Sequence, residues 1–321
     1  MQATLIYNKT AGQTNALTPD DLLDALREAG YEPVYRPTET MADLDTALDG
    51  VTGLVVSAGG DGTAKAVATR LIHNQHAAMV ILPMGTANNL TYTLRMEGTP
   101  LEILARMRRP KKVKFDLGHV VAPWGEDYFI EGAGLGFFAE VLATYRPEDG
   151  KSVTRSVQSL VEVLRKGYGQ QTTLRLPETA VSTEFLLVEV LNARAVGPRL
   201  KFAPDADPTD GLLHVVCIDG SKRESYFRYL RSMLTEEMEE LPSVSTYAVP
   251  WLEIDWQGFP FHVDDYVRPQ DFDFREADDD VLVRYYPDVP VEATIRIEVL
   301  PSALNIWLPQ DDAEKETTHE D

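Results

Sequence analysis

The chain has little cysteine, little histidine and a shortage of positive charge. Its 321 residues include one cysteine and six histidines, and 51 acidic residues against 30 basic ones give a net charge of −21. A single cysteine supports neither a disulfide framework nor a cysteine zinc site, which favours a reducing, intracellular compartment. The negative field repels nucleic-acid phosphates, so no nucleic-acid partner is expected. The histidines show no metal-ligand spacing and are interpreted as surface or packed residues.

Long apolar runs are absent as well. No stretch approaches the ~20 apolar residues that a membrane-spanning helix needs, and the N-terminus lacks the pattern of a signal peptide. A cytoplasmic protein is therefore expected, and any lipid would be met at the membrane surface. Cys217 lies within the apolar run 212–218, where it is expected to be a small core residue.

Strand and helix patterns alternate up to about residue 112. Thr18 and Thr40 stand where N-cap residues stand, Pro19 suits a first helical turn, and Gly30 can end the first helix. This order predicts a parallel, doubly wound, Rossmann-like α/β sheet. The predicted strands are 4–8, 33–36, 53–57 and 79–82, and the predicted helices are 18–29, 41–48 and 64–72.

Strand patterns dominate the rest of the chain and predict a second, mostly antiparallel β domain. We expect an α/β domain over 1–115, which 301–309 are a candidate to rejoin, and a β-rich domain over 116–300. The acidic residues 310–321 are predicted to be disordered. The predicted strands are 113–121, 127–132, 172–176, 185–192, 212–218, 247–256, 281–286 and 295–300, and the predicted helices are 137–145, 153–166 and 222–234.

Three polar, glycine-bearing loops follow three of the predicted parallel strands, at residues 8–12, 57–63 and 83–89. The carboxyl ends of parallel strands meet at one sheet edge, where ligands bind. Glycines allow close backbone approach there, and helix N-termini attract anions. One such loop alone would be explained as a tight turn with Asp61 as a helix cap. Three converging loops favour a nucleotide site, in which a cation would have to bridge Asp61 to phosphate.

Two of these loops, Gly59-Gly60-Asp61-Gly62-Thr63 and Pro83-Met84-Gly85-Thr86-Ala87-Asn88, resemble those of bacterial diacylglycerol kinases and related lipid kinases. These enzymes share a fold with NAD kinases and sphingosine kinases. The resemblance covers most of the chain and implies an NAD kinase/diacylglycerol kinase-like fold with a sandwich-like, lipid-binding second domain. Phosphofructokinases share the first motif, whereas the ordered set is specific. Further matching segments are 8–12, with Lys9 in place of proline, 114–118, 132–136, 201–206, 209–212 and 301–304.

The resemblance implies a kinase that uses ATP and Mg²⁺ to phosphorylate the hydroxyl of diacylglycerol or a related lipid alcohol. It implies a structural magnesium bound by Asp210, with the backbone carbonyls of Asp207 and Leu212. The alternative for Asp210 is a turn residue before Gly211. The residues that it implies for ATP are Asn8, Lys9, Thr10, Ala11, Gly12, Thr38, Gly59, Gly60, Asp61, Gly62, Thr63, Gly85, Thr86 and Asn88.

The catalytic carboxylate of such kinases lies in an Asp-Gly-Glu turn near the C-terminus. Here Asp264 occupies the aspartate position, Asp265 replaces the glycine and Tyr266 replaces the glutamate. Asp264 is the candidate base, and Asp265 is the candidate substitute for the missing acid. Tyrosine does not bind metal like a carboxylate at neutral pH. A second departure is Lys65-Ala66, where the family has Asn-Glu. The alternative for Asp264 and Asp265 is a solvated hairpin turn.

A basic run, 106–114, has six basic residues in nine positions. It is either a solvated linker between the domains or a transient contact with an anionic membrane surface, where each basic residue contributes roughly 1 kcal/mol. Two functional alternatives also stay open: an NAD kinase, and an inactive nucleotide- or lipid-binding homologue, which the change at 265–266 favours. A homodimer is a candidate assembly.

Overall fold

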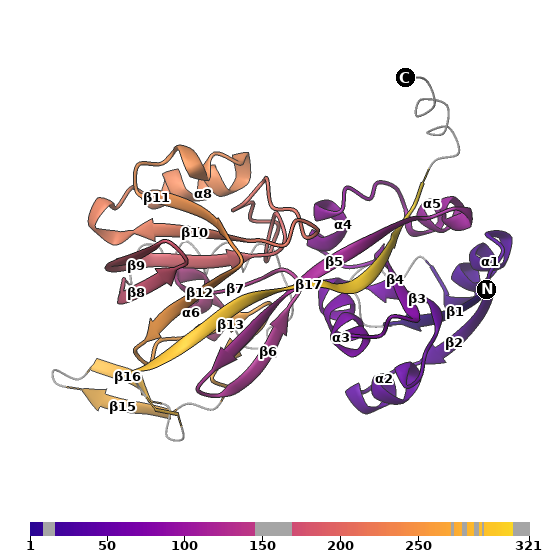
Figure 1. Cartoon of the computed structure of the whole chain (residues 1–321), viewed down its shortest axis with the longest axis horizontal. Coiled ribbons are helices and arrows are strands. Elements are labelled where there is room, and N and C mark those ends of the chain that lie inside the picture. Colours follow the sequence, from indigo (N-terminus) through magenta and orange to yellow (C-terminus); the bar gives the residue numbers. More distant parts are fainter. Residues whose placement is uncertain are drawn as a thin grey trace. The chain divides into compact units, whose positions relative to one another are not determined.

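The computed structural model describes residues 1–8, 17–144, 169–270, 273–277, 281–285, 289–290 and 292–310. The chain divides into two compact units (Figure 1). Unit 1 is Met1–Asp116 with the segment from Pro301 onward, and unit 2 is Leu117–Leu300. Strands β5 (Lys111–Ala122) and β17 (Ala293–Leu308) belong partly to each unit. The predictions for Lys9–Gly12, for a helix at 153–166 and for a disordered tail at 311–321 lie outside the described residues.

Unit 1 is built on a parallel sheet in the order β2-β1-β3-β4-β17. The predicted doubly wound α/β fold is confirmed. Its further strands are β1 (Gln2–Tyr7), β2 (Glu32–Pro37), β3 (Gly53–Gly59) and β4 (Ala77–Pro83), and its helices are α1 (Pro19–Glu28), α2 (Met41–Leu48), α3 (Asp61–Leu71), α4 (Asn89–Thr93), α5 (Pro100–Ala105) and the 3₁₀ turn η2 (Arg106–Arg108).

The parallel sheet of unit 1 is covered on both faces. Alternate residues of β1, β3 and β4, such as Leu5, Val56 and Val80, pack with α1 and α5. The other residues of these strands point to the opposite face, and Figure 1 shows α2 and α3 on that side of the sheet. Burial on both faces explains why β3 and β4 are nearly continuous apolar runs.

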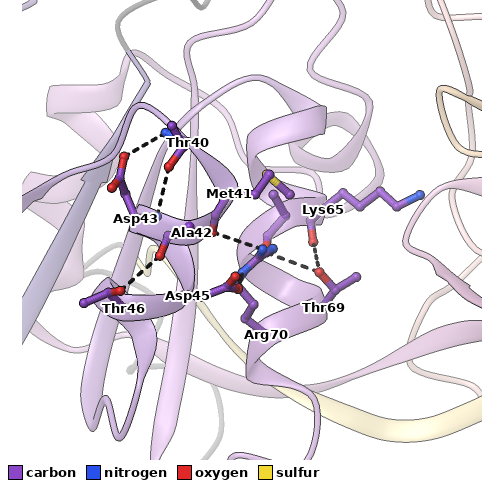
Figure 2. Close-up of polar contacts among 10 residues, drawn as sticks. Thr40, Met41, Ala42, Asp43, Asp45, Thr46, Lys65, Thr69 and Arg70 are labelled. Atoms are coloured by element: carbon purple, nitrogen blue, oxygen red, sulfur yellow. Dashed lines mark hydrogen bonds and ion pairs between the residues drawn. The ribbon is translucent and has the colours of Figure 1, made fainter.

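Helix α2 begins in a reciprocal cap and is joined to α3 (Figure 2). The Thr40 hydroxyl accepts a hydrogen bond from Asp43 N at 3.1 Å, and the Asp43 carboxylate accepts one from Thr40 N at 2.9 Å. The Thr40 backbone bond, with a second from Glu39, lowers the pKa of Asp43. Arg70 of α3 contacts Asp45 at 2.5 Å and the Met41 carbonyl at 3.4 Å. These contacts brace the helix whose first turn carries the glycine motif.

Unit 2 is mostly antiparallel, as predicted. Its strands run in the order β14-β13-β7-β9-β8-β12-β17, with β10 on β9, β11 on β10 and β6 on β5. The strands are β6 (Gly125–Phe129), β7 (Gly132–Gly136), β8 (Gln170–Leu176), β9 (Thr179–Leu191), β10 (Leu213–Asp219), β11 (Val244–Val249), β12 (Trp251–Trp256), β13 (Phe261–Val263), β14 (Tyr266–Arg268), β15 (Asp273–Ala277) and β16 (Val281–Tyr285), and the helices are α6 (Phe137–Thr144) and α8 (Tyr226–Thr235), with 3₁₀ turns η4 (Gly220–Lys222) and η5 (Met238–Glu240).

Two apolar clusters form the core of unit 2. One lies among the strands and includes Trp256, Phe129 and Cys217, which confirms Cys217 as a core residue. The other lies beneath the helices and includes Phe137 of α6 and Met233 of α8. In the described ranges, none of the helices has both the length and the apolarity that crossing a membrane requires.

Several details of the sequence prediction were wrong. The strand predicted over 247–256 is two strands, β11 and β12, which meet at Pro250, because proline lacks the N–H that a continuous ladder needs. The strand predicted over 127–132 ends at Phe129, and β7 begins at Gly132. Sequence analysis missed β7 because glycine is depleted in strands. It also missed the short helices α4 and α5.

Candidate active site

The two glycine loops of unit 1 touch through their backbones. Gly60, the N-cap of α3, follows β3, and Gly85 follows the neighbouring strand β4. A Cβ atom on Gly85 would lie 2.5 Å from the Gly60 Cα, and one on Gly60 would lie 3.2 Å from the Gly85 Cα. Real Cβ atoms do not approach to 2.5 Å, so position 85 requires glycine for steric reasons, and a side chain at position 60 would be tightly packed.

Asn88 holds the second loop in shape. Its backbone is left-handed, with φ of 53°, a conformation that asparagine tolerates. The Asn88 side-chain oxygen accepts a hydrogen bond from Gly85 N at 2.8 Å, and its amide donates to Gly85 O at 3.0 Å. The exposed Thr86 lies in the turn that these bonds close. The loop is therefore fixed without any ligand contact.

Asp61 links the starts of two helices. It is the first residue of α3, but its carboxylate accepts a hydrogen bond from Leu90 N, at 3.2 Å, in the first turn of α4. It therefore caps α4, whereas the N-cap residue of α3, Gly60, has no side chain. This cross-link orients the Gly60 loop against the Gly85 loop.

Asn8 brings the first loop to the same edge of the sheet. Its backbone N donates to Ala58 O at 3.0 Å, and its side chain donates to the Thr63 hydroxyl at 2.9 Å. A Cβ atom on Gly59 would lie 2.4 Å from that hydroxyl, whereas Gly62 faces open space. Thr38 follows β2, the strand next to β1, and is partly exposed. The loops thus present backbone amides and the α3 N-terminus at one edge, which suits an anionic ligand.

Asp264 of unit 2 is held by main-chain amides. It lies in the two-residue turn between β13 and β14 with φ of 50°. One carboxylate oxygen, Oδ1, accepts hydrogen bonds from Glu131 N at 2.9 Å and Gly132 N at 3.1 Å. The other, Oδ2, accepts one from Ile130 N at 3.2 Å. The hairpin is thus not a merely solvated turn, because this carboxylate is anchored to the segment before β7.

The replacements of glycine and glutamate have separate consequences. Asp265 is exposed at the second turn position, and the positive φ is carried by Asp264. Aspartate tolerates that conformation, so the turn does not need the family's glycine. Tyr266 begins β14 with 46% of its surface exposed, 5.6 Å from the Arg268 guanidinium. Arg268 is in turn bound by both oxygens of Asp127, at 2.7 and 2.8 Å.

Sequence analysis missed a buried histidine behind this turn. His262 is 1% exposed, and its ring lies 3.0 Å from the Asp264 carbonyl and 3.1 Å from the buried Glu189 carboxylate. Burial by itself would lower the pKa of His262, but the charge of Glu189 and the hydrogen bonds to Glu189 and Asp264 outweigh it and raise that pKa. No sequence signal joins positions 73 residues apart.

The predicted magnesium loop is a turn fixed by its own carboxylates. The Asp210 carboxylate accepts a hydrogen bond from Leu212 N at 2.8 Å and lies 3.7 Å from His214. Asp207 accepts bonds from Thr209, and its carbonyl accepts one from Asp210 N at 3.3 Å. In its observed contacts, Asp210 is therefore a turn residue that binds the backbone just after Gly211.

The donor chemistry of this loop also fits magnesium. One carboxylate and two carbonyl oxygens are hard ligands, and Mg²⁺ usually retains several waters. Within the described ranges, no group of three or more His, Cys, Asp or Glu side chains is arranged to hold a metal ion. A magnesium ion would thus depend on Asp210, the carbonyls of Asp207 and Leu212, and water.

Comparison with known proteins places both units in known families. Residues 2–120 match the family described as "Diacylglycerol kinase catalytic domain", and residues 154–271 match the "YegS C-terminal NAD kinase beta sandwich-like domain". A crystal structure of a diacylglycerol kinase from Bacillus anthracis superposes with a TM-score of 0.61 over 96% of each chain, at 15% identity. That likeness shows the fold.

Curated relatives give the family. A protein of Chromohalobacter salexigens named "Probable lipid kinase YegS-like" is 28% identical over 255 residues, which cover 74% of this chain and 79% of the relative. A protein of the same name from Pseudomonas aeruginosa is 33% identical over 225 residues, covering 66% of this chain and 70% of the relative. With both domain matches in chain order, these similarities lead to one conclusion: the chain belongs to the family of YegS-like lipid kinases.

Proposed function

We propose that the protein transfers the γ-phosphoryl group of ATP, with Mg²⁺, to the hydroxyl of diacylglycerol or a related lipid alcohol. The observation that supports this most strongly is the interlocked pair of glycine loops, in which Gly60 and Gly85 meet and Asp61 binds Leu90 N. Such loops hold phosphate through backbone amides. Phosphoryl transfer depends mainly on positioning and charge stabilisation, which this architecture can supply.

The residues have distinct proposed roles. Residues of the loops at 8–12, 59–63 and 85–88, with Thr38, hold the nucleotide, and Asp61 orients the loops and faces the cation that accompanies ATP. Bound magnesium neutralises charge that develops on the phosphates. The loop of Asp207, Asp210 and Leu212 would hold a structural magnesium.

Asp264 accepts the proton of the attacking hydroxyl in this proposal. Three amide hydrogen bonds fix its carboxylate, and Oδ2 accepts the longest of them, at 3.2 Å. We assign proton acceptance to Oδ2. The other candidate acid, Asp265, is exposed one residue later and has an auxiliary role in place of the family's glutamate.

Turnover of Mg-ATP with dispersed lipids tests the activity. Diacylglycerol, phosphatidylglycerol, a sphingoid base and a polyprenol are the acceptors, and NAD is included to test the alternative of an NAD kinase. Asp264→Asn should lower turnover by about 10²–10⁴-fold and leave ATP affinity unchanged, because general-base catalysis is worth about that much. The matched control is Asp265→Asn in the same turn. A larger loss with Asp265→Asn would move the base to that residue.

An inactive nucleotide- or lipid-binding protein is the second candidate. It is favoured by Tyr266, which supplies no carboxylate at the family's glutamate position and contacts Arg268 instead. Purified protein that binds Mg-ATP but transfers phosphate to none of the acceptors would establish this alternative.

The membrane contact is also a proposal. The contacts of the basic residues indicate which of them are available for it. Arg106 donates to the Glu97 and Glu102 carbonyls, Lys112 lies 4.9 Å from the Trp307 ring centroid, and Lys114 donates to Asn305 at 2.7 Å. These three are engaged within unit 1. The exposed members that remain for anionic headgroups are Arg108, Arg109 and Lys111. Because the run covers η2 and the start of β5, it is not an extended linker.

A further inference from the structure

The buried Glu189 and His262 lie on two strands that flank the glycine-rich strand β7. Gly134 of β7 is opposite Glu189 of β9 on one side and opposite His262 of β13 on the other. Strands two apart in a sheet are separated by about 10 Å. The two side chains nevertheless meet, with the His262 Nε2 atom 3.0 and 3.1 Å from the two Glu189 oxygens.

Glycine makes this contact across β7 possible. A Cβ atom on Gly134 would lie 3.0 Å from one Glu189 carboxylate oxygen, and one on Gly132 would lie 3.2 Å from the other. A Cβ atom on Gly134 would also lie 2.1 Å from the Val188 carbonyl oxygen, so side chains at these positions would crowd both the Glu189 carboxylate and the β9 backbone. The glycines of β7 are therefore explained by steric requirements of the fold.

The opposite charges of Glu189 and His262 compensate each other in a buried site. Glu189 is fully buried, and an isolated buried carboxylate would be strongly unfavourable. His262 Nε2 faces the Glu189 carboxylate and Nδ1 faces the Asp264 carbonyl, two acceptors that an imidazolium with a proton on each nitrogen satisfies together. The charge of Glu189, which raises the pKa of His262, favours that form. Glu189 and Asp264 are the charged groups that act on the ring, and the Phe138 ring of α6 packs edge-on with centroids 4.8 Å apart.

The second ring nitrogen connects this pair to the turn. His262 Nδ1 lies 3.0 Å from the carbonyl oxygen of Asp264, whose own N–H donates to Gly132 O at 2.8 Å. The side chain of Asp264 is fixed by the amides of residues 130–132. Residues 130–132 therefore bind the backbone N–H and both carboxylate oxygens of Asp264, and the imidazolium binds its carbonyl oxygen.

We propose that the Glu189–His262 pair positions Asp264, acting through its main-chain carbonyl, for proton transfer from the lipid hydroxyl. This inference rests on the proposed kinase function. It assigns positioning roles to both residues, since neither touches the reacting atoms. A positive φ at a non-glycine residue is unfavourable unless the surroundings enforce it, and the imidazolium supplies part of that enforcement.

The test compares His262→Gln with His119→Gln. His119 is a matched control, because its ring also contacts a glutamate, Glu126 at 3.1 Å, in the same unit. His262→Gln should lower kcat about tenfold or more with the KM for ATP unchanged, since a misplacement of 1 Å can cost about 10²-fold. His119→Gln should change neither constant.

A double-variant cycle separates positioning from a structural role. In protein that already carries Asp264→Asn, His262→Gln should lower turnover little further, because the group that it positions is gone. Full multiplication of the two losses would overturn the inference. So would wild-type kinetics for folded His262→Gln.

Glu189→Gln serves as the second variant if His262→Gln fails to fold. Without the Glu189 charge, burial lowers the pKa of His262 below its usual value of about 6.5, so turnover should already be reduced at pH 6.5, while wild type keeps its activity to higher pH. Nitrogen-15 NMR of the ring should show wild-type His262 still protonated above that pH. A neutral wild-type ring, or identical pH profiles, would overturn the inference. Wild-type protein inactive toward every lipid would instead overturn the proposed function, and this role with it.

Discussion

At the scale of single residues, two candidate functional aspartates, one in each unit, bind backbone amides of segments distant in sequence. Asp61 accepts from Leu90 N, and Asp264 accepts from three amides of residues 130–132. Both contacts orient a loop, so loss of either carboxylate combines two effects: the loss of a charge and the loss of an anchor. Substitutions by asparagine and by alanine distinguish them.

Asp61→Asn should retain the fold and lose Mg-ATP affinity. An asparagine oxygen can still accept from Leu90 N, while the charge that we propose to face the cation is removed. Asp61→Ala should lose both, with a further cost of about 1 kcal/mol in the free energy of unfolding for the lost cap. Titration calorimetry with Mg-ATP and chemical unfolding measure the two quantities. If folded Asp61→Asn binds Mg-ATP with wild-type affinity, the role of Asp61 is limited to orienting the loops.

Cys217 should be unreactive in the native protein. Burial raises its pKa to about 12, so almost no thiolate exists near pH 8, and the residue is 3% exposed. Labelling with a thiol reagent should be slow in buffer and fast in denaturant. Equally fast labelling in both would show that the core of unit 2 opens readily.

At the scale of elements, the two glycine loops form one unit because β3 and β4 are adjacent parallel strands. Their turns leave the sheet at the same edge. Asn88 fixes the shape of the second turn, and Asp61 joins it to the first. The geometry of the loops therefore depends on the small size of residues 60 and 85.

Gly85→Ala should destabilise the protein and abolish nucleotide binding. The new methyl would lie 2.5 Å from the Gly60 Cα, and overpacking of this kind costs about 1–3 kcal/mol. Gly62→Ala is the stability control, because its methyl meets nothing within 4 Å in the first turn of α3. It should stabilise the fold by up to about 1 kcal/mol. Equal unfolding free energies for the two variants would refute the steric explanation.

Thr40→Ala should weaken α2 by about 1 kcal/mol, the usual contribution of an N-cap. The Thr40 hydroxyl accepts from Asp43 N, and no alanine atom replaces it. Thr46→Ala on the same helix is the control, since its hydroxyl only donates to the Ala42 carbonyl. Denaturant unfolding should show a deficit for Thr40→Ala alone, and a comparable deficit in both variants would contradict the capping role.

At the scale of the whole molecule, the charge is strongly negative and the exposed basic residues of the 106–114 run stand out against it. A net charge of −21 opposes approach to an anionic membrane. A local basic group can overcome this only within about a Debye length, ~8 Å at physiological ionic strength.

Reversal of Arg108, Arg109 and Lys111 to glutamate should reduce sedimentation with anionic vesicles and leave ATP affinity unchanged. The difference should fade as salt rises. The control reverses Arg27, Arg36 and Arg228, three other exposed arginines, and so changes the net charge equally. If both triple variants sediment alike, net charge alone governs the interaction and the 106–114 run has no special role.

The sequence alone determined the local features of this protein. Thr18 and Thr40 cap the helices that their positions indicated, and the apolar runs at 53–57 and 79–82 became adjacent buried strands. Helix caps, strand periodicity and the glycine motifs are set by neighbours within a few residues, so a single sequence displays them. The ordered motifs were therefore sufficient to indicate the kinase family.

Only the tertiary structure decided which distant residues meet. The Gly60–Gly85 contact, the Asp61 bond to Leu90 and the amides around Asp264 each join segments that the chain brings together only by folding. Most of all, His262 and Glu189 are ordinary polar residues in the sequence and become an ion pair because Gly134 between them has no side chain. Such contacts depend on strand order and register, which local propensity does not encode.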